Sequence, residues 1–191
     1  MDYKTVDARI LKINKNELMA RLAMPTLADN DFSELYYLLL SEARLAYAAT
    51  RVPIIRDNGG IIVGCVKTAS RALTEFSSGA TSYIALVATL GVGVDRLILK
   101  ASKTSSVNAF VIDAMADALI EALCDYAECE LCQGLNAKGR FSPGYADLEL
   151  SVGYEILSLC KAEKTLGIKV TESGLMVPKK SVNALIAVKE E

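Results

Sequence analysis

The pattern of apolar and polar positions predicts helices in the first quarter of the chain. Lys15 to Met24 has the pattern of a short helix that ends at Pro25. Asp31 and Glu34 form a capping box ahead of apolar residues at helical spacing, so we expect a second helix that stops before Pro53. The apolar residues of this second helix are Phe32, Leu35, Tyr36, Leu39, Leu40, Ala43, Ala46 and Tyr47.

A β-hairpin and a short helix are predicted next. Ile54-Ile55 and Ile61-Ile62-Val63 flank the turn sequence Asp57-Asn-Gly-Gly60, which is typical of a hairpin. One or two helical turns are expected around Ser70 to Phe76. These elements mix strands and helices without strict alternation, and that favours antiparallel pairing.

A buried strand over Tyr83 to Leu90 leads into Gly91-Val-Gly93 and a helix from about Val94 to Lys100. Gly-x-Gly after a strand also begins the dinucleotide-binding fingerprint. Arg96 stands where the third glycine is required, and no acidic residue closes a following strand to bind the ribose. We therefore favour a tight turn over a phosphate cradle.

The helix expected after Ser106 is the most regular element of the sequence. Its apolar stripe predicts a core-facing side. The stripe is formed by Val107, Phe110, Val111, Ala114, Met115, Ala118, Leu119, Ala122, Leu123 and Tyr126.

The opposite side of this helix carries an acidic row, Asp113, Asp117, Glu121 and Asp125, at intervals of four residues. Like charges at this spacing cost roughly 0.2–0.5 kcal/mol per pair. Two interpretations stay open: a face that is solvated or neutralised by Lys and Arg from a neighbouring element, or a source of negative potential for a bound cation, with Glu121 at its centre.

The last third of the chain contains the sequence Arg140-Phe-Ser-Pro-Gly-Tyr145, in which Pro143 and Gly144 predict a turn. An irregular loop that holds a guanidinium and an aromatic ring suits a zwitterionic ligand. A helix over Leu148 to Glu163 follows. Strands over Ile168 to Val170 and Leu185 to Val188 complete an α+β fold, with a mainly antiparallel twisted sheet flanked by helices.

Composition excludes several classes of function. The net charge is −2, which lacks the basic footprint of a nucleic-acid-binding protein. The longest apolar stretch, Tyr83 to Val94, is too short to span a bilayer, and no secretory signal is visible. We therefore expect a cytoplasmic protein without a membrane or nucleic-acid partner. Because the sequence has no histidine, it cannot build a Ser-His-Asp relay or a histidine metal site.

Three of the five cysteines, Cys124, Cys129 and Cys132, have the spacing of plant-type ferredoxin ligands, with Cys160 as a distant fourth. At least the first two fall in the long predicted helix, where positions five apart point about 140° away from each other. Free cysteines are commonly small buried apolar residues. We therefore expect reduced thiols and no metal site, and the pattern leaves the role of these cysteines open.

Arg140-Phe-Ser-Pro-Gly-Tyr145, followed by Gly167-Ile-Lys-Val-Thr-Glu-Ser173 and Met176-Val-Pro178, resembles the activation domain of cobalamin-dependent methionine synthase. That module binds S-adenosylmethionine. The resemblance is clear from about Val87 to Val188, and Ala88-Thr-Leu-Gly91 with Asp95-Arg96 belongs to it. It implies a single activation-type domain over residues 1–191, with a helical and hairpin part over 1–80 and the S-adenosylmethionine site in 81–191.

The resemblance implies that S-adenosylmethionine is presented to cobalamin in the inert cob(II) state. One electron from a donor such as flavodoxin or ferredoxin gives cob(I)alamin, which takes the sulfonium methyl group. The homocysteine, folate and corrin modules do not fit in 191 residues, so cobalamin must come from a partner methionine synthase core. The chain is then a component of a methyltransferase in methionine biosynthesis, with no catalytic residue and no independent turnover.

Four ligand-binding residues are carried over from the family. Arg140 matches the arginine that meets the methionine carboxylate, and Ser142 stands where the backbone contacts adenine. Tyr145 matches the loop tyrosine beside the ligand, and Glu121 the carboxylate near its amino and sulfonium end. The chain departs from the family after Tyr145, where it contains Ala-Asp-Leu-Glu in place of a Pro- and Cys-containing run.

Two alternatives stay open from this resemblance. The chain reactivates another corrinoid methyltransferase, or it is a non-enzymatic interaction module that has kept the fold and lost ligand binding. Binding of S-adenosylmethionine separates the second alternative from the rest.

Overall fold

The computed structural model of the 191-residue chain describes every residue except 1, 12, 14–17, 19–28, 58 and 191. Its centre is a five-stranded sheet with the strand order β1-β2-β6-β10-β7, in which every pair is antiparallel. These strands are β1 (Asp2–Thr5), β2 (Ala46–Pro53), β6 (Ser82–Thr89), β7 (Leu135–Phe141) and β10 (Ser181–Glu190). The α+β fold class with an antiparallel sheet is confirmed.

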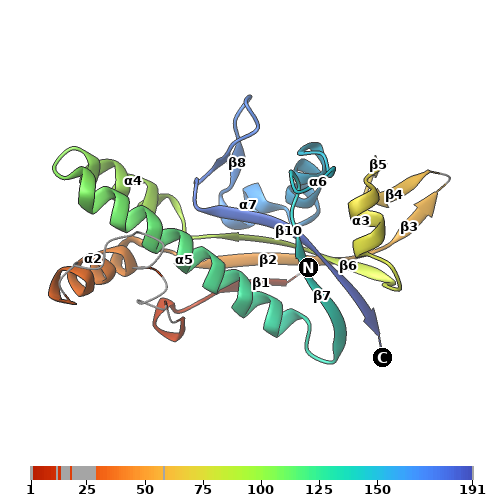
Figure 1. The fold of residues 1–191 in the computed structure, drawn as a ribbon, viewed down its shortest axis with the longest axis horizontal. Coiled ribbons are helices and arrows are strands. Elements are labelled where there is room, and N and C mark those ends of the chain that lie inside the picture. Colours follow the sequence, from red (N-terminus) through yellow and green to blue (C-terminus); the bar gives the residue numbers. More distant parts are fainter. Residues whose placement is uncertain (1, 12, 14–17, 19–28, 58, 191) are drawn as a thin grey trace.

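In the part of the chain that the structure describes, the helices α2 (Asp29–Glu42), α4 (Val92–Ser102) and α5 (Ser106–Leu131) cover one face of the sheet (Figure 1). Alternate side chains of β2, β6 and β10, such as Tyr47, Leu86 and Ile186, pack against these helices in one apolar core. The long α5 runs obliquely across this face.

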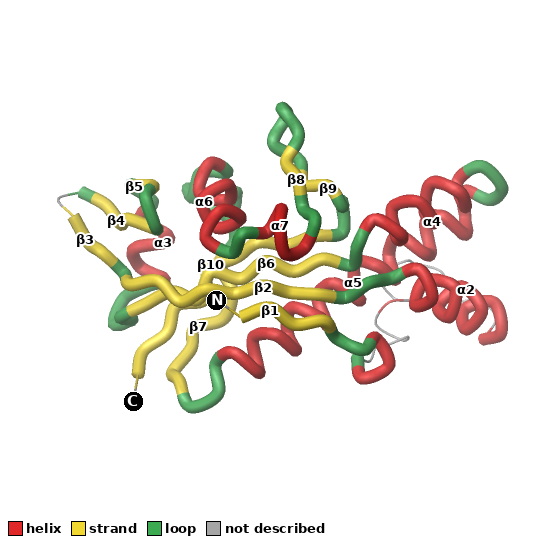
Figure 2. Tube along the Cα trace, turned by 180° about the vertical axis from the view of Figure 1, so that it is seen from behind, coloured by secondary structure: helices red, strands yellow, loops and turns green. Residues whose placement is uncertain are grey.

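The other face of the sheet carries a second core, to which Tyr83, Val87 and Leu185 contribute from the sheet. Figure 2 shows α6, α7 and the β8–β9 hairpin standing on this face, with the smaller β3-β4-β5 sheet at one end. Its elements are β3 (Ile55–Asp57), β4 (Gly60–Val63), β5 (Val66–Thr68), α3 (Arg71–Phe76), α6 (Ser151–Leu159), α7 (Ala162–Leu166), β8 (Lys169–Val170) and β9 (Met176–Val177). A 3₁₀ turn, η1 (Ala8–Ile10), follows β1.

The second predicted helix is confirmed only in part. It ends at Glu42 as α2, and Ala46 and Tyr47 belong to β2. This correction has a physical reason: Ala48 and Val52 face one core while Tyr47 and Ala49 face the other, so the segment is apolar on both sides. Asp31 lies within the helix, so it is not the N-cap that we predicted. The helix predicted over Lys15 to Met24 lies outside the described residues, Leu18 excepted.

The apolar face of α5 is rotated from the predicted stripe. Val107 and Phe110 are 51% and 55% exposed. Ile112, Ala116 and Ile120 are buried instead, together with Val111, Met115, Leu119 and Leu123. The rotation follows from packing on two sides, because α5 contacts both the sheet and the neighbouring helices α2 and α4.

The beginning of α4 needs two glycines, one for its backbone conformation and one for packing. Gly91 is the N-cap of α4 with a φ of 81°. A Cβ on Gly93 would lie 2.2 Å from the carbonyl oxygen of Glu42, so only glycine permits this approach of α4 to the end of α2. This supports the tight turn that we favoured over a phosphate cradle.

The helix predicted over Leu148 to Glu163 is divided in the structure. Between α6 and α7 the backbone of Lys161 takes the left-handed conformation, with a φ of 49°. The predicted hairpin, the short helix near residue 70 and the strands β6, β8 and β10 are confirmed. No helix in the described ranges is both long enough and apolar enough to cross a membrane.

Candidate functional site

Arg140 is the centre of a charge cluster between β7 and α5. Its Nη2 lies 3.0 Å from Glu121 Oε2 and 2.8 Å from Asp125 Oδ1, and its Nη1 donates to Glu128 Oε2 at 2.8 Å. Positions 121, 125 and 128 share one helix face, which explains how one guanidinium reaches all three carboxylates. The structure therefore places two of the predicted site residues, Arg140 and Glu121, in direct contact.

The position of Arg140 corrects the prediction that it lies on an irregular loop. It is the penultimate residue of β7, opposite Ile186 of β10. Ile186 belongs to the core on the α5 side, and strand alternation turns Arg140 to that same side. A strand holds a guanidinium more firmly than a loop does, and the Arg140 side chain is only 18% exposed.

The guanidinium of Arg140 has no bidentate edge left for a ligand carboxylate. Nη2 contacts both Glu121 and Asp125, and Nη1 contacts Glu128, so both two-nitrogen edges of the fork are already engaged. One cation faces three carboxylates, which leaves a formal excess of two negative charges. In this conformation the cluster attracts a cationic group, and a carboxylate must displace Glu121 or Asp125 to bind in the same way.

Lys180, just before β10, pairs with the other end of the acidic row. Its Nζ lies 2.9 Å from Asp113 Oδ1 and 2.6 Å from Asp117 Oδ1. Burial acts to lower the pKa of Lys180 and of Arg140, but the hydrogen bonds that both groups donate to carboxylates, together with the carboxylate charges, outweigh it, and the pKa of both groups is raised. The interpretation that Lys and Arg from neighbouring elements pair with this row is confirmed. A role for Glu121 towards a bound cation stays a prediction.

The loop between β7 and α6 is tied to the beginning of α3 by Asp147. Oδ2 of Asp147 accepts from the backbone N–H of Arg71 at 2.8 Å, and Oδ1 accepts from the Ser70 hydroxyl at 2.5 Å and from Ala72 N–H at 3.2 Å. These hydrogen bonds lower the pKa of the Asp147 carboxyl group, and the one from the Ser70 hydroxyl contributes most. The carboxylate thus fixes the loop that carries Ser142 and Tyr145.

Tyr145 lies on the outer side of this loop. Its ring meets Phe141 edge-on with centroids 5.4 Å apart, and the residue is 68% exposed. Its backbone N–H donates to Ser142 O at 3.1 Å, as the predicted turn requires. The structure therefore separates Tyr145 from the groove described next, although the two share a loop.

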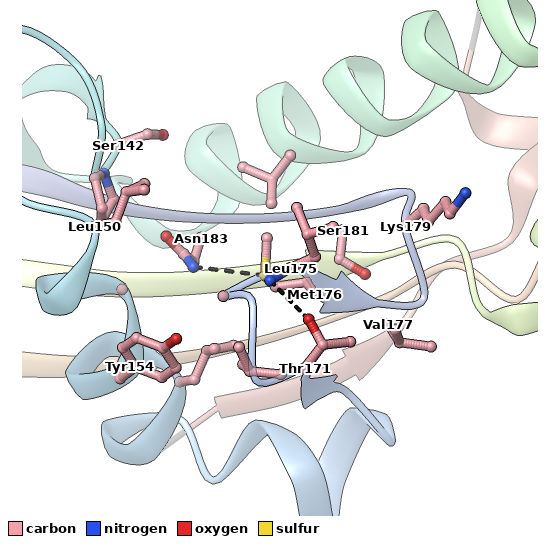
Figure 3. Close-up of a pocket in the computed structure, with 16 residues that line it drawn as sticks. Ser142, Leu150, Tyr154, Thr171, Leu175, Met176, Val177, Lys179, Ser181 and Asn183 are labelled. Carbon is pink, nitrogen blue, oxygen red and sulfur yellow. Dashed lines mark hydrogen bonds between the residues drawn. The ribbon is translucent and has the colours of Figure 1, made fainter.

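A groove of about 740 Å³ lies between the β7–α6 loop, α6, the β8–β9 hairpin and the first residues of β10 (Figure 3). Its lining is mostly apolar, with Leu150 and Met176 among the larger side chains. Ser142 lies at one end and Asn183 near the middle. Apolar grooves with a few polar groups are the usual form of small-molecule sites.

The groove opens along an unpaired edge of the sheet. On the β7 side, β10 is paired over Leu185–Glu190, and no described strand pairs with this side of residues 181–184. Arg140 stands where this pairing begins, and Lys180 stands just before residue 181. The two ion-pair clusters of α5 therefore flank the open edge, and the groove begins beside it.

The structure brings the predicted residues Arg140 and Glu121 into contact and places Ser142 in the groove lining, and their roles in ligand binding stay predictions. Sequence reasoning did not name Glu128 or Asn183. Glu128 was detectable, because it continues the acidic face by three residues. Asn183 was not, because an amide in a buried strand gives no pattern by itself.

The cysteines are distributed over the molecule. Cys124 and Cys160 are buried, and burial raises the pKa of each thiol to about 12. Cys65 and Cys129 are exposed, and Cys132 is half-buried. In the part of the chain that the structure describes, no three cysteines or carboxylates are arranged to hold a metal ion. Cys124 is a core residue of α5.

Comparison with known proteins was made at the level of sequence and of structure. No protein-family model matches the sequence, and no curated protein matches it either. Among solved structures, the crystal structure of the MetH reactivation domain bound to AdoHcy superimposes with a TM-score of 0.74. The match covers 97% of this chain and 77% of that chain, at 17% sequence identity. The chain has the fold of that reactivation domain.

Proposed function

We propose that this chain binds S-adenosylmethionine and supports reductive methylation of cob(II)alamin on a partner cobalamin-dependent methionine synthase. The observation that carries the proposal is the direct contact of Arg140 with Glu121 on the α5 side of the sheet, two residues before Ser142, which lines the groove on the other side of the open β10 edge. This arrangement lies on the fold of a domain whose crystal structure holds AdoHcy. Arg140 and Ser142 also belong to the sequence motif that carries the resemblance, which supports the same proposal.

The proposed ligand bridges the charge cluster and the groove. Its amino acid end lies beside Arg140 and Glu121, and its adenosine end lies in the groove near Ser142. Arg140 is opposite Ile186, and three residues along β10 from Ile186 span roughly 10 Å. That distance suits the length of the ligand. The excess negative charge beside Arg140 favours the α-amino and sulfonium groups of this ligand.

S-adenosylmethionine, when bound, supplies an electrophilic methyl group. The residues of this chain bind and orient it, and the cobalt centre belongs to the partner. The chain contains no histidine to serve as a lower ligand to cobalt. Its role is therefore that of a component of a methyltransferase, acting in the cytoplasm together with an electron donor such as flavodoxin or ferredoxin.

Exposed apolar side chains around the groove support a partner that acts in trans. Leu150 is 71% exposed, and Leu175 and Tyr154 are also exposed. All three line the groove, on the loop, the hairpin and α6. Clustered exposed apolar residues commonly mark interaction surfaces. A surface of this kind at the mouth of the site fits a cobalamin-carrying domain that approaches the sulfonium methyl group.

Titration calorimetry with S-adenosylmethionine and with S-adenosylhomocysteine tests the binding step. We expect binding in the micromolar range for the wild-type chain. The absence of binding at millimolar ligand would overturn the proposal and favour a non-enzymatic interaction module with the same fold.

An anaerobic assay tests the partner. A methionine synthase core without its own reactivation domain, in the cob(II) state with reduced flavodoxin, should form methylcobalamin only when this chain is added. If S-adenosylmethionine binds but no methylcobalamin forms, the same assay with another corrinoid methyltransferase decides between the two corrinoid partners.

A further inference from the structure

Asn183 presents a polar amide to the groove from the beginning of β10. Its Nδ2 donates to the thioether sulfur of Met176 at 3.5 Å, a weak acceptor. Its Oδ1 has no hydrogen-bond partner among the described residues. The hydrogen-bonding capacity of this half-buried amide is therefore largely unused. It is available for a ligand that has both a donor and an acceptor.

The hydroxyl groups of Thr171 and Ser181, which also line the groove, already make hydrogen bonds within the protein. Thr171 Oγ1 accepts from Leu175 N–H at 3.1 Å. Ser181 Oγ donates to Pro178 O at 2.7 Å and lies 2.9 Å from Thr89 Oγ1. Asn183 is therefore the group with the most hydrogen-bonding capacity left for a ligand in this part of the groove.

Gly153 of α6 shows that the structure makes room for this amide. A Cβ at position 153 would lie 3.2 Å from Asn183 Nδ2 and 3.5 Å from its Oδ1. Glycine in the interior of a helix is unfavourable relative to alanine, so its presence in α6 accommodates a neighbour. Figure 3 shows Asn183 between Ser142 and Met176, with Tyr154 across the groove.

We propose that Asn183 makes the groove selective for a 6-aminopurine base. This inference rests on the proposed function, because it assigns the adenine end of the same ligand. Asn Oδ1 accepts from the adenine 6-amino group while Nδ2 donates to N7, the two-bond pairing by which asparagine recognises adenine edges. A 6-oxopurine presents two acceptors at these positions, so the amide cannot satisfy both with either orientation.

The test is calorimetry of the full chain with S-adenosylhomocysteine and S-inosylhomocysteine, which differ only at purine position 6 and the adjacent N1 proton. We expect the wild-type chain to prefer the adenosyl ligand by roughly tenfold or more. Asn183→Ala should reduce this preference to within about threefold. Asn183→Asp should also weaken adenosyl binding, because a carboxylate cannot donate to N7.

Asn136→Ala is the matched control, since Asn136 is an exposed amide on β7 outside the groove. It should keep the full preference. Equal affinity of the wild-type chain for both ligands overturns the role of Asn183 while leaving the proposed function intact, and this comparison needs no variant to fold. Failure of the wild-type chain to bind S-adenosylmethionine or S-adenosylhomocysteine overturns the proposed function, and the assignment of Asn183 with it.

Discussion

The two ends of the proposed ligand site differ in how their polar groups are satisfied. Beside α5, Arg140 is already paired with three carboxylates, so this end is ordered without a ligand. In the groove, the amide of Asn183 has only a thioether as partner. The first end therefore supplies rigidity and charge, and the second supplies unused hydrogen-bonding capacity. Substitutions at the charged end should consequently change the stability of the fold. Substitutions in the groove should change the selectivity for the ligand.

Arg140→Ala should have the largest effect at the charged end. Removal of the guanidinium leaves Glu121, Asp125 and Glu128 facing one another without a counter-charge. We expect a loss of about 1–3 kcal/mol in the free energy of unfolding, since two of the carboxylates are well solvated. We also expect a loss of S-adenosylmethionine affinity of tenfold or more, because Glu121 and Asp125 lose the partner that holds them in position beside the ligand. Denaturant unfolding and calorimetry measure the two quantities.

Arg140→Lys should recover little of either quantity, because an ammonium group cannot contact three carboxylates in a planar fork. If Arg140→Ala destabilises the chain while the affinity, measured well below the melting temperature, stays within about threefold, then Arg140 is only a structural ion pair.

Glu121→Gln decides which ligand group the charged end recognises. If the acidic row attracts the amino and sulfonium groups, the affinity for S-adenosylmethionine should fall by roughly tenfold. A rise in affinity would instead mean that a ligand carboxylate competes with Glu121 for Arg140. Asp113→Asn is the matched control, because it removes a carboxylate of the same row that pairs with Lys180.

Asp147→Ala tests whether the loop must be held in place. We expect S-adenosylmethionine affinity to fall by about threefold to tenfold, with faster hydrogen exchange at the Leu148 amide. Ser77→Ala is the control: it removes a hydrogen bond to Leu73 O at the far end of α3 and leaves the loop contacts intact. Unchanged exchange at Leu148 in the Asp147 variant would contradict this role.

The effect of Asp147 should depend on pH. Hydrogen bonds lower its pKa in the folded state, so the carboxylate adds stability above its unfolded pKa, near 4. That contribution disappears as the pH falls through the folded value. The difference in melting temperature between wild type and Asp147→Ala should therefore be constant at neutral pH and shrink below about pH 4.

Tyr145 should show the smallest effect. Its ring packs on Phe141, and an aromatic pair of this kind contributes about 0.5–1.5 kcal/mol. Tyr145→Ala should therefore lower stability by this amount, and Tyr145→Phe should leave it unchanged. A loss of ligand affinity beyond tenfold in Tyr145→Phe would instead place the hydroxyl group in the site. Thermal unfolding and calorimetry distinguish the two outcomes.

The elements that the sequence predicted well are those with a strong local period. The hairpin β3–β4 has a glycine turn between apolar runs, and α4 and α5 have long helical patterns. β2 was missed because its alanines and Tyr47 also fit helical spacing, and only burial on both faces makes it a strand. β7 was missed because Gly139 and exposed polar residues weaken its pattern.

The candidate site shows the same limit. Arg140 and Ser142 were found because their motif is local, and the acidic row was found because its residues share one helix. The pairing of that row with Arg140 and Lys180, and the position of Asn183 opposite Gly153, depend on strands that are distant in sequence. No periodicity within a short window contains that information.

The pairing of β10 has a consequence for how the site forms. Ser181 is paired with Thr89, and Val188 with Ser82, so the strand that carries Asn183 finds its partners about a hundred positions away. Contacts of such long sequence separation form slowly, because a large loop must close first. Neither β7 nor α6 can assemble the groove alone. We therefore expect the groove to form late in refolding. A ligand should bind only those chains whose central sheet has already formed.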